Sequence, residues 1–416
     1  MAMDGKELVE KLAKLSQVQS IKDIPQLTHA LFPGTHCPLM GAAMAVGGIK
    51  DSLIVVVGTD ECTYYTKSMT IHSEKFGGID GRCVSVVLDD HDVTFGSAEK
   101  VQEAFKEIIE EYRPQCVFLV TTCVIEIIGD DFDAISEGLS KLYGIPVLPV
   151  HTEHFKCEDH LPGLERTITV CAEMMKSCDC ENSVNLLGQR MGDFATTELY
   201  AMLQKAGVKI GLQLPCGCSV DDIKNAAAAK VNIVVNDIAL PLAQKMQEKF
   251  GIPYVYFNKF VIPEKIYEAY KNLFVYLDLE LPGELEGLYQ NAREKIEKNK
   301  GELEGITYIY GNTPYAVFEM NCFLSSLGMV PQVIQTNRYT EADEPYAKEI
   351  LQYTDPYVCK AANIAPLQYV YDVLSPYLYL GHEFGNRLRQ KGMPLLTVTE
   401  QVACLVLKLQ DIYCSS

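Results

Sequence analysis

The run SLIVVV at residues 52–57 leads directly into GTDECTYYTKSM at 58–69, and this junction decides how the first part of the chain folds. An uninterrupted apolar run rich in β-branched residues is typical of a strand buried on both faces of a parallel sheet. We expect a loop to follow it, carrying Asp60, Glu61 and Cys62. This cysteine is open to three interpretations: a covalent nucleophile, a buried structural thiol or a metal ligand.

The same pattern continues on both sides of this strand. Strand-like runs at 83–88, 116–122 and 145–150 alternate with helical stretches at 97–113 and 130–143. In the helical stretches apolar residues recur every three or four positions, and the first of them follows a serine suited to an N-cap. Strands alternating with helices in this way predict βαβ units and a parallel sheet.

The alternation recurs twice more along the chain, so we predict three α/β domains. A Cys- and charge-rich stretch at 176–183 and a polar, helix-prone stretch at 291–305 are the predicted linkers. The predicted division is a helical leader at 1–35, a first domain at 36–175, a second at 181–300 and a third at 301–416.

Composition limits the kinds of partner. The chain has 416 residues, of which 48% are hydrophobic, and this suits two or three globular domains of about 100–200 residues each. No apolar run approaches the roughly 20 residues that cross a bilayer, and the N-terminal stretch lacks a signal-peptide core, so we expect a cytoplasmic protein without membrane contact. A net charge of −19 argues against nucleic acid as a partner. Fifteen cysteines in that compartment indicate core or metal-binding thiols rather than disulfides.

The predicted sheet sorts the cysteines by position. Ligands of open parallel sheets bind beyond the carboxyl ends of the strands. Cys62 and Cys123 each follow a predicted strand and belong to that edge, whereas Cys83 and Cys116 begin their strands and are expected to be structural. Cys37 lies in a Gly/Pro loop before a helix start, where exposed N–H groups and the helix dipole stabilise a thiolate. Cysteines 37, 62 and 123 can therefore converge.

The kind of metal is open at this point. Zinc sites usually carry paired C-x₂₋₄-C knuckles, and none involves these three cysteines. Scattered thiolates fit an iron–sulfur cluster at least as well, with a fourth ligand from Asp60, Glu61 or a neighbouring chain. If Cys62 were instead a nucleophile it would need a base, and His91 is the candidate.

Other cysteines form less specific pairs. Cys216 and Cys218 lie beyond the strand-like run at 208–214, where a C-x-C pair can chelate a second metal or simply fill a tight turn. The segment containing Cys157 and the pair Cys178 and Cys180 have no clear place at a strand end.

Three segments together resemble a known family. They are CPLMGAAMAVGGIKDSLIVVVGTDEC (37–62), DVTFG (92–96) and TTCVIEIIGDD (121–131), and their order and spacing are similar to component 1 of nitrogenase and its relatives. Further segments between 184 and 258 follow the second domain of that family in order. The likeness covers nearly the whole chain.

The resemblance implies three Rossmann-like domains and an iron–sulfur cluster, either [4Fe–4S] or a larger bridging cluster, bound by Cys37, Cys62 and Cys123 at a subunit interface. It also implies a homodimeric, ATP-dependent reductase as the electron donor, and either a homodimer or an α₂β₂ assembly with a paralogous subunit. No phosphate-binding G-x₄-G-K-[ST] loop occurs in this chain, which agrees with ATP hydrolysis by a partner.

Two departures from nitrogenase itself affect the expected function. Asn236 stands where nitrogenase has the cysteine that holds its catalytic cofactor, and His382 follows a different motif from the cofactor histidine. We therefore predict a nitrogenase-like oxidoreductase for a substrate other than dinitrogen, such as a tetrapyrrole. A scaffold for metallocofactor assembly is the alternative, and a cluster-free α/β binding protein is a third possibility. A second metallocluster or a tetrapyrrole near Cys216 and Asn236 stays open.

Overall fold

The computed structural model describes residues 5–27, 36–71, 82–157, 159–190, 194–257, 262–311, 317–360, 364–381, 393 and 395–396. His382 lies outside these residues. The chain forms two compact units. The central unit comprises residues 35–258 and 271–280, and the terminal unit comprises residues 1–34, 259–270 and 281–416.

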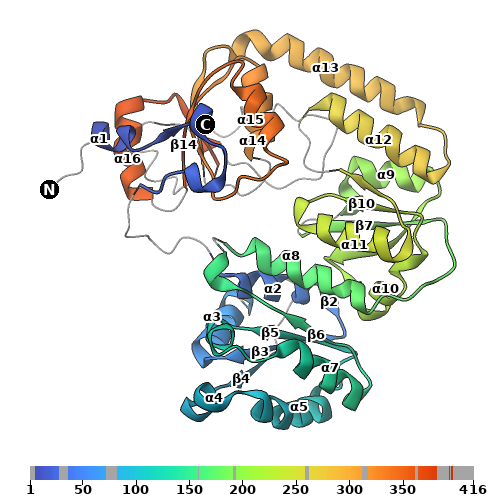
Figure 1. The fold of residues 1–416 in the computed structure, drawn as a ribbon. Helices are drawn as coiled ribbons and strands as arrows, with labels where there is room; N and C mark the ends of the chain where they lie inside the picture. Colours follow the sequence, from blue (N-terminus) through green and yellow to red (C-terminus); the bar gives the residue numbers. More distant parts are fainter. Residues whose placement is uncertain are drawn as a thin grey trace. The chain divides into compact units, whose positions relative to one another are not determined.

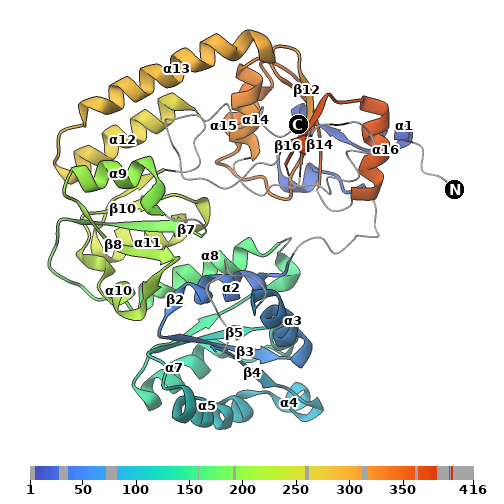
Figure 2. The same cartoon turned by 180° about the vertical axis from the view of Figure 1, so that it is seen from behind.

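The first sheet of the central unit is fully parallel, with strand order β4-β3-β5-β6. Helices α2 and α8 cover one face and α5 and α7 the other (Figures 1 and 2). Its strands are β3 (Ser52–Gly58), β4 (Cys83–Val87), β5 (Cys116–Thr121) and β6 (Val147–Val150). Its helices are α2 (Pro38–Gly47), α3 (Asp60–Ile71), α4 (Asp90–Phe95), α5 (Ala98–Tyr112), α6 (Cys123–Ile128), α7 (Phe132–Tyr143) and α8 (Leu161–Val170).

The second sheet of the central unit is also parallel, with order β11-β10-β7-β8. A short pair, β2 (Ile49–Lys50) with β9 (Cys218–Ser219), joins the segment before β3 to the segment after β8. The strands are β7 (Ser183–Gln189), β8 (Lys209–Pro215), β10 (Val231–Val234) and β11 (Tyr254–Tyr256), and the helices are α9 (Glu198–Lys205), α10 (Val220–Lys224) and α11 (Leu240–Phe250).

The terminal unit contains a third sheet, with order β1-β14-β13-β12-β15-β16, in which only the edge strand β1 is antiparallel. Helix α12 (Pro263–Leu277) contributes residues to both units. The strands are β1 (Ala13–Lys14), β12 (Thr307–Gly311), β13 (Val330–Gln335), β14 (Tyr357–Cys359), β15 (Leu378–Gly381) and β16 (Leu395–Leu396). The helices are α1 (Gly5–Glu10), α13 (Gly283–Leu303), α14 (Val317–Ser326), α15 (Glu344–Ile350) and α16 (Ile364–Leu374).

The prediction of an α/β fold with three helix-flanked parallel sheets is confirmed. The predicted domain limits at 176–180 and near 300 stay predictions. The first two sheets belong to one compact unit, which has no division at 176–180. The polar stretch at 291–305 is helical, as expected, and forms most of α13. No helix among the described residues has both the length and the apolar character that a membrane span requires.

The predicted helical leader is wrong over most of the part that the structure describes, residues 5–27. There only Gly5–Glu10 is α-helical, and the chain continues as strand β1 and two short 3₁₀ turns. Leu15 and Ile24 pack in the core on the third sheet, beside residues of β12 and α14. Burial against a distant sheet outweighs the weak local preference for a helix.

Candidate functional site

Two of the predicted ligands follow strands that end at the same edge of the first sheet. Strands β3 and β5 are hydrogen-bonded neighbours, with Val57 opposite Thr121 at their carboxyl ends. Cys62 follows β3 and Cys123 follows β5. The strand order therefore agrees with the prediction that these two cysteines lie at the same edge of the sheet.

Cys62 lies in a helix and not in the expected loop. Helix α3 begins at Asp60, and both Asp60 and Glu61 lie in its first turn, where carboxylates interact favourably with the helix dipole. The Thr59 hydroxyl donates to the Cys62 sulfur at 3.5 Å, and the Thr63 hydroxyl bonds to Ser85 of β4 at 2.9 Å. The acidic residues that indicated a loop thus mark a helix start.

Cys37 is the residue that precedes helix α2. Because α2 leads through β2 into β3, its N-terminus faces the carboxyl edge of the sheet. The helix packs tightly on α8, since a Cβ on Gly41 would overlap the His160 carbonyl and one on Gly163 would overlap the Pro38 carbonyl. Two glycines therefore set the position of the backbone next to Cys37.

The ends of β3 and β5, which lead to Cys62 and Cys123, are themselves in contact. Gly58 has φ of +158°, and a Cβ there would lie 2.7 Å from the Thr122 methyl. The Thr122 hydroxyl donates to the Val57 carbonyl at 2.9 Å. Only glycine permits this approach, which holds the residue before Cys123 against the end of β3.

The Cys123 thiol responds electrostatically to the other two. Burial raises the pKa of the Cys123 thiol above its ordinary value, and the nearby thiols of Cys62 and Cys37 raise this pKa further. Neighbouring thiolates repel one another, so each makes ionisation of the next less favourable. This is expected of metal ligands before the metal binds. The thiols of Cys62 and Cys37 are therefore near enough to Cys123 to act on its pKa, and thiolates are the donors that suit an iron–sulfur cluster.

The described residues contain one group whose ligand atoms all lie within 4.8 Å of one another, formed by Asp89, His91 and Asp92. Asp89 and Asp92 form the capping box of α4, and Lys100 pairs with both carboxylates. The imidazole of His91 lies on the surface beside Phe95, at 4.8 Å between ring centroids. The two aspartates of the group therefore cap a helix and pair with a lysine. His91, the candidate base, is an exposed residue that packs on Phe95.

Sequence reasoning missed Glu126, which organises the edge beside Cys123. One of its carboxylate oxygens accepts hydrogen bonds from the Thr121 hydroxyl at 2.7 Å, the Thr152 hydroxyl at 3.1 Å and the Glu153 backbone N–H at 2.6 Å. The bonds join α6 to the segment after β6. The only signal in the sequence was its position one turn after Cys123.

A hollow of about 350 Å³ lies at this edge beside α6. Glu126, His151 and Glu153 line it together with the apolar side chains of Ile127 and Phe155. His151 pairs with Asp133 at 3.1 Å, and Glu153 pairs with Arg166 at 2.6 Å. The hollow therefore has both polar and apolar lining residues.

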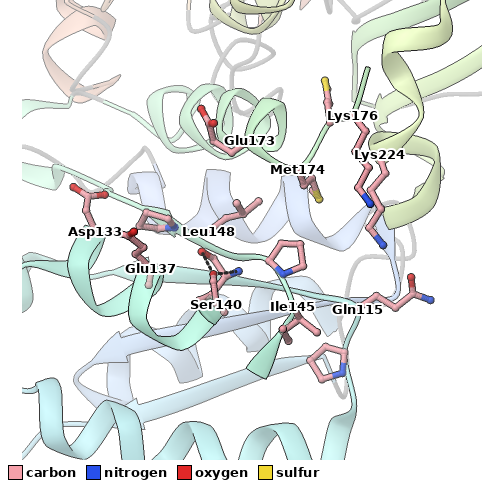
Figure 3. A pocket seen from close by; sticks show the side chains of 17 residues that line it. Gln115, Asp133, Glu137, Ser140, Ile145, Leu148, Glu173, Met174, Lys176 and Lys224 are labelled. Carbon is pink, nitrogen blue, oxygen red and sulfur yellow. Dashed lines mark hydrogen bonds between the residues drawn. The ribbon is translucent and has the colours of Figure 1, made fainter. Parts of the chain in front are cut away.

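A larger hollow of about 970 Å³ extends along β6 and α7. Lys176 and Lys224 lie side by side at one end, with Asp133 and Glu137 at the other (Figure 3). The Ser140 hydroxyl accepts from the Val147 N–H at 2.8 Å, which covers part of the open edge of β6. None of the three predicted ligands lines this hollow.

The predicted second pair, Cys216 and Cys218, has a different environment. Cys218 is buried in β9, and burial raises its pKa to about 12. Cys171 is also buried, and after burial itself the thiols of Cys116 and Cys218 are what raise its pKa. Burial favours neutral thiols here, so a second metal at Cys216 and Cys218 stays a prediction from sequence alone. Cys157 is half-buried, and Cys178 and Cys180 are exposed.

Asn236 has a structural role in the second sheet. Its side-chain oxygen accepts from the Ile238 backbone N–H at 3.2 Å, capping the turn after β10, and the residue is buried. A Cβ on Gly188 would lie 2.8 Å from the Asn236 Cβ, so the site is closely packed.

Cys83 and Cys116, which begin strands, are buried as expected, and together with the buried Cys359 at the end of β14 they predict sensitivity to alkali. Burial raises the pKa of Cys83 to about 11 and those of Cys116 and Cys359 to about 12. The folded state keeps these protons where the unfolded state loses them, so stability is full below pH about 8.5 and falls as pH rises toward 12. We expect urea unfolding under reducing conditions to show a loss of more than about 2 kcal/mol between pH 8 and 10.

Substitution of single cysteines separates the effect of the buried thiols on stability from the titration of other groups. Cys359→Ala should make the pH dependence shallower, whereas Cys178→Ala, at an exposed position, should leave it unchanged. Equal slopes in both variants would contradict the assignment to buried thiols.

Fold and site together define a class, an α/β protein of three parallel sheets with Cys62 and Cys123 following neighbouring strands of the first. Residues 37–402 match the family model for nitrogenase component 1 type oxidoreductases. The chain belongs to this nitrogenase component 1 type oxidoreductase family.

Individual relatives include two kinds of protein. The chain is 30% identical over 224 residues to the nitrogenase iron-molybdenum cofactor biosynthesis protein NifE of Clostridium pasteurianum, covering 53% of this chain and 49% of that protein. This match spans about half the length of the relative. The nitrogenase molybdenum-iron protein alpha chain of the same organism is 24% identical over 370 residues, covering 85% of this chain and 68% of that protein.

A solved structure supports the fold. The structure described as nitrogenase Cp1 at pH 6.5 superposes with a TM-score of 0.74 at 14% identity, covering 92% of this chain and 88% of that chain. At this identity the likeness extends to the fold alone.

Proposed function

We propose that this chain is an iron–sulfur component that receives electrons from an ATP-dependent reductase and passes them to a substrate or metallocofactor. The proposal is supported by the positions of Cys62 and Cys123 after neighbouring strands, and by the thiols of Cys62 and Cys37, which raise the pKa of Cys123. Thiolates are the usual ligands of such clusters, and a bound cluster supplies reversible one-electron transfer. The residues of the chain hold the sulfurs in place and limit the access of water.

The surface around these thiols supports an assembly. A large apolar side chain is exposed after each of the four strands that end at this edge. They are Tyr64 at 72%, Phe95 at 75%, Ile127 at 71% and Phe155 at 71% exposure. Apolar residues repeated along one edge are typical of an interaction surface, and a partner there would shield a cluster from solvent. We propose a second subunit at this edge, either another copy of the chain or a paralogue.

A scaffold for metallocofactor assembly is the second candidate. It is supported by the similarity to NifE, whose name states a role in cofactor biosynthesis. Asn236 also favours a scaffold. It occupies a closely packed capping position, and an amide is a poor ligand for a soft metal cluster, so a cofactor would not be held permanently there.

Anaerobic purification followed by iron and acid-labile sulfide analysis and EPR tests the shared part of both proposals. We expect one cluster per chain, or one per pair of chains if the cluster bridges two subunits. A chain that binds no iron after reconstitution would contradict both. Electron transfer from a reductase with ATP supports the enzyme, whereas release of an intact metallocofactor to an acceptor protein supports the scaffold.

A further inference from the structure

The ring of His36, beside Cys37, is hydrogen-bonded to another helix. Its Nδ1 lies 3.1 Å from the Tyr65 hydroxyl of α3. Tyr65 follows Cys62 by three residues, so the two lie on the same face of α3, about one turn apart. The bond therefore joins the residue next to one predicted ligand to the helix that carries another.

Helix α8 restrains the same segment from a second side. The ring of His160, which precedes α8, meets the ring of His36 edge-on at 6.3 Å between centroids. Gly41 of α2 packs on the backbone of α8 in the same region. The segment before α2 is thus held by α8 through packing and by α3 through one hydrogen bond.

We propose that the His36–Tyr65 hydrogen bond positions Cys37 relative to Cys62, so that a cluster meets thiols that are already in place. The inference rests on the proposed iron–sulfur site. Ligands on separate elements must lose freedom when they bind, and a bond formed before binding reduces that cost. His36 and Tyr65 are positioning residues here, acting through the two cysteines.

Tyr65→Phe removes the hydroxyl and keeps the ring. In the reconstituted full chain we expect cluster loss to an iron chelator to become about fivefold faster, as the loss of one net hydrogen bond predicts. We also expect a changed EPR line shape, with the thermal midpoint of the metal-free protein lowered by no more than about 2 °C, because one hydrogen bond is a small part of the stability of a chain of this length. Tyr112→Phe is the matched control, because it removes a hydroxyl from an exposed tyrosine of α5, on the opposite face of the sheet from α2, and it should behave as wild type.

A double-mutant cycle tests whether the two residues act together. His36→Asn should accelerate cluster loss, and adding Tyr65→Phe to it should cause no further acceleration. Additive effects, or a Tyr65→Phe variant with wild-type loss rate and EPR spectrum, would overturn the proposal.

A measurement on metal-free protein separates this inference from the proposed function. In a Cys178→Ser, Cys180→Ser background, a bifunctional thiol reagent should bridge Cys37 and Cys62 more slowly once Tyr65→Phe is introduced. An unchanged bridging rate, or no bridging in the parent, refutes the positioning role. A parent that bridges in this Tyr65-dependent way but binds no iron would instead refute the iron–sulfur function.

Discussion

The Cys123→Ala variant, purified anaerobically, is expected to hold less than about a tenth of the wild-type iron. Cys123 is the thiol whose pKa responds to both of the others, so it lies within electrostatic reach of each. Its removal leaves Cys62 in α3 and Cys37 before α2, and a metal site with missing ligands loses most of its affinity. Iron content, acid-labile sulfide and the EPR signal measure the result.

Cys83→Ala is the control within the same sheet. Cys83 begins β4 and is buried, so this variant should lose stability through a small cavity and retain its iron. Cys37→Ala and Cys62→Ala should lose iron as Cys123→Ala does. Full iron in any of these three would remove that residue from the proposed ligand set.

The Gly163→Val variant is expected to lose more than about 3 kcal/mol of unfolding free energy, near the upper end of overpacking effects. A Cβ at this position would overlap the Pro38 carbonyl and lie 2.8 Å from the Pro38 Cα. Both contacts involve backbone, so α2 and α8 must move apart to admit a larger side chain. The movement displaces the segment that carries Cys37, and cluster binding should weaken as well.

Urea denaturation and iron content measure the two consequences. Gly138→Ala in α7 is the matched control, because the added methyl meets nothing within 4 Å and a helical Gly→Ala change typically stabilises by up to about 1 kcal/mol. A Gly163→Val protein with wild-type stability would show that the α2–α8 contact tolerates separation.

The strands and the thiols that follow them could be predicted from local sequence. The runs that form β3 and β5 are short, apolar and bounded by turn residues, and these features depend on adjacent residues. The start of α3 at Asp60 was missed because carboxylates after a glycine are typical both of a turn and of a first helical turn. The leader was missed because its apolar residues pack on a sheet formed by the far end of the chain.

By itself, the sequence determined the α/β class and the cysteines available at strand ends, since strand periodicity and spacing are local properties. The tertiary structure decided that β3 and β5 are neighbours, and that α2 meets their edge. It also decided that His36 reaches Tyr65. These arrangements depend on backbone contacts such as that between Gly163 and Pro38, which form only when helices distant in the sequence pack together.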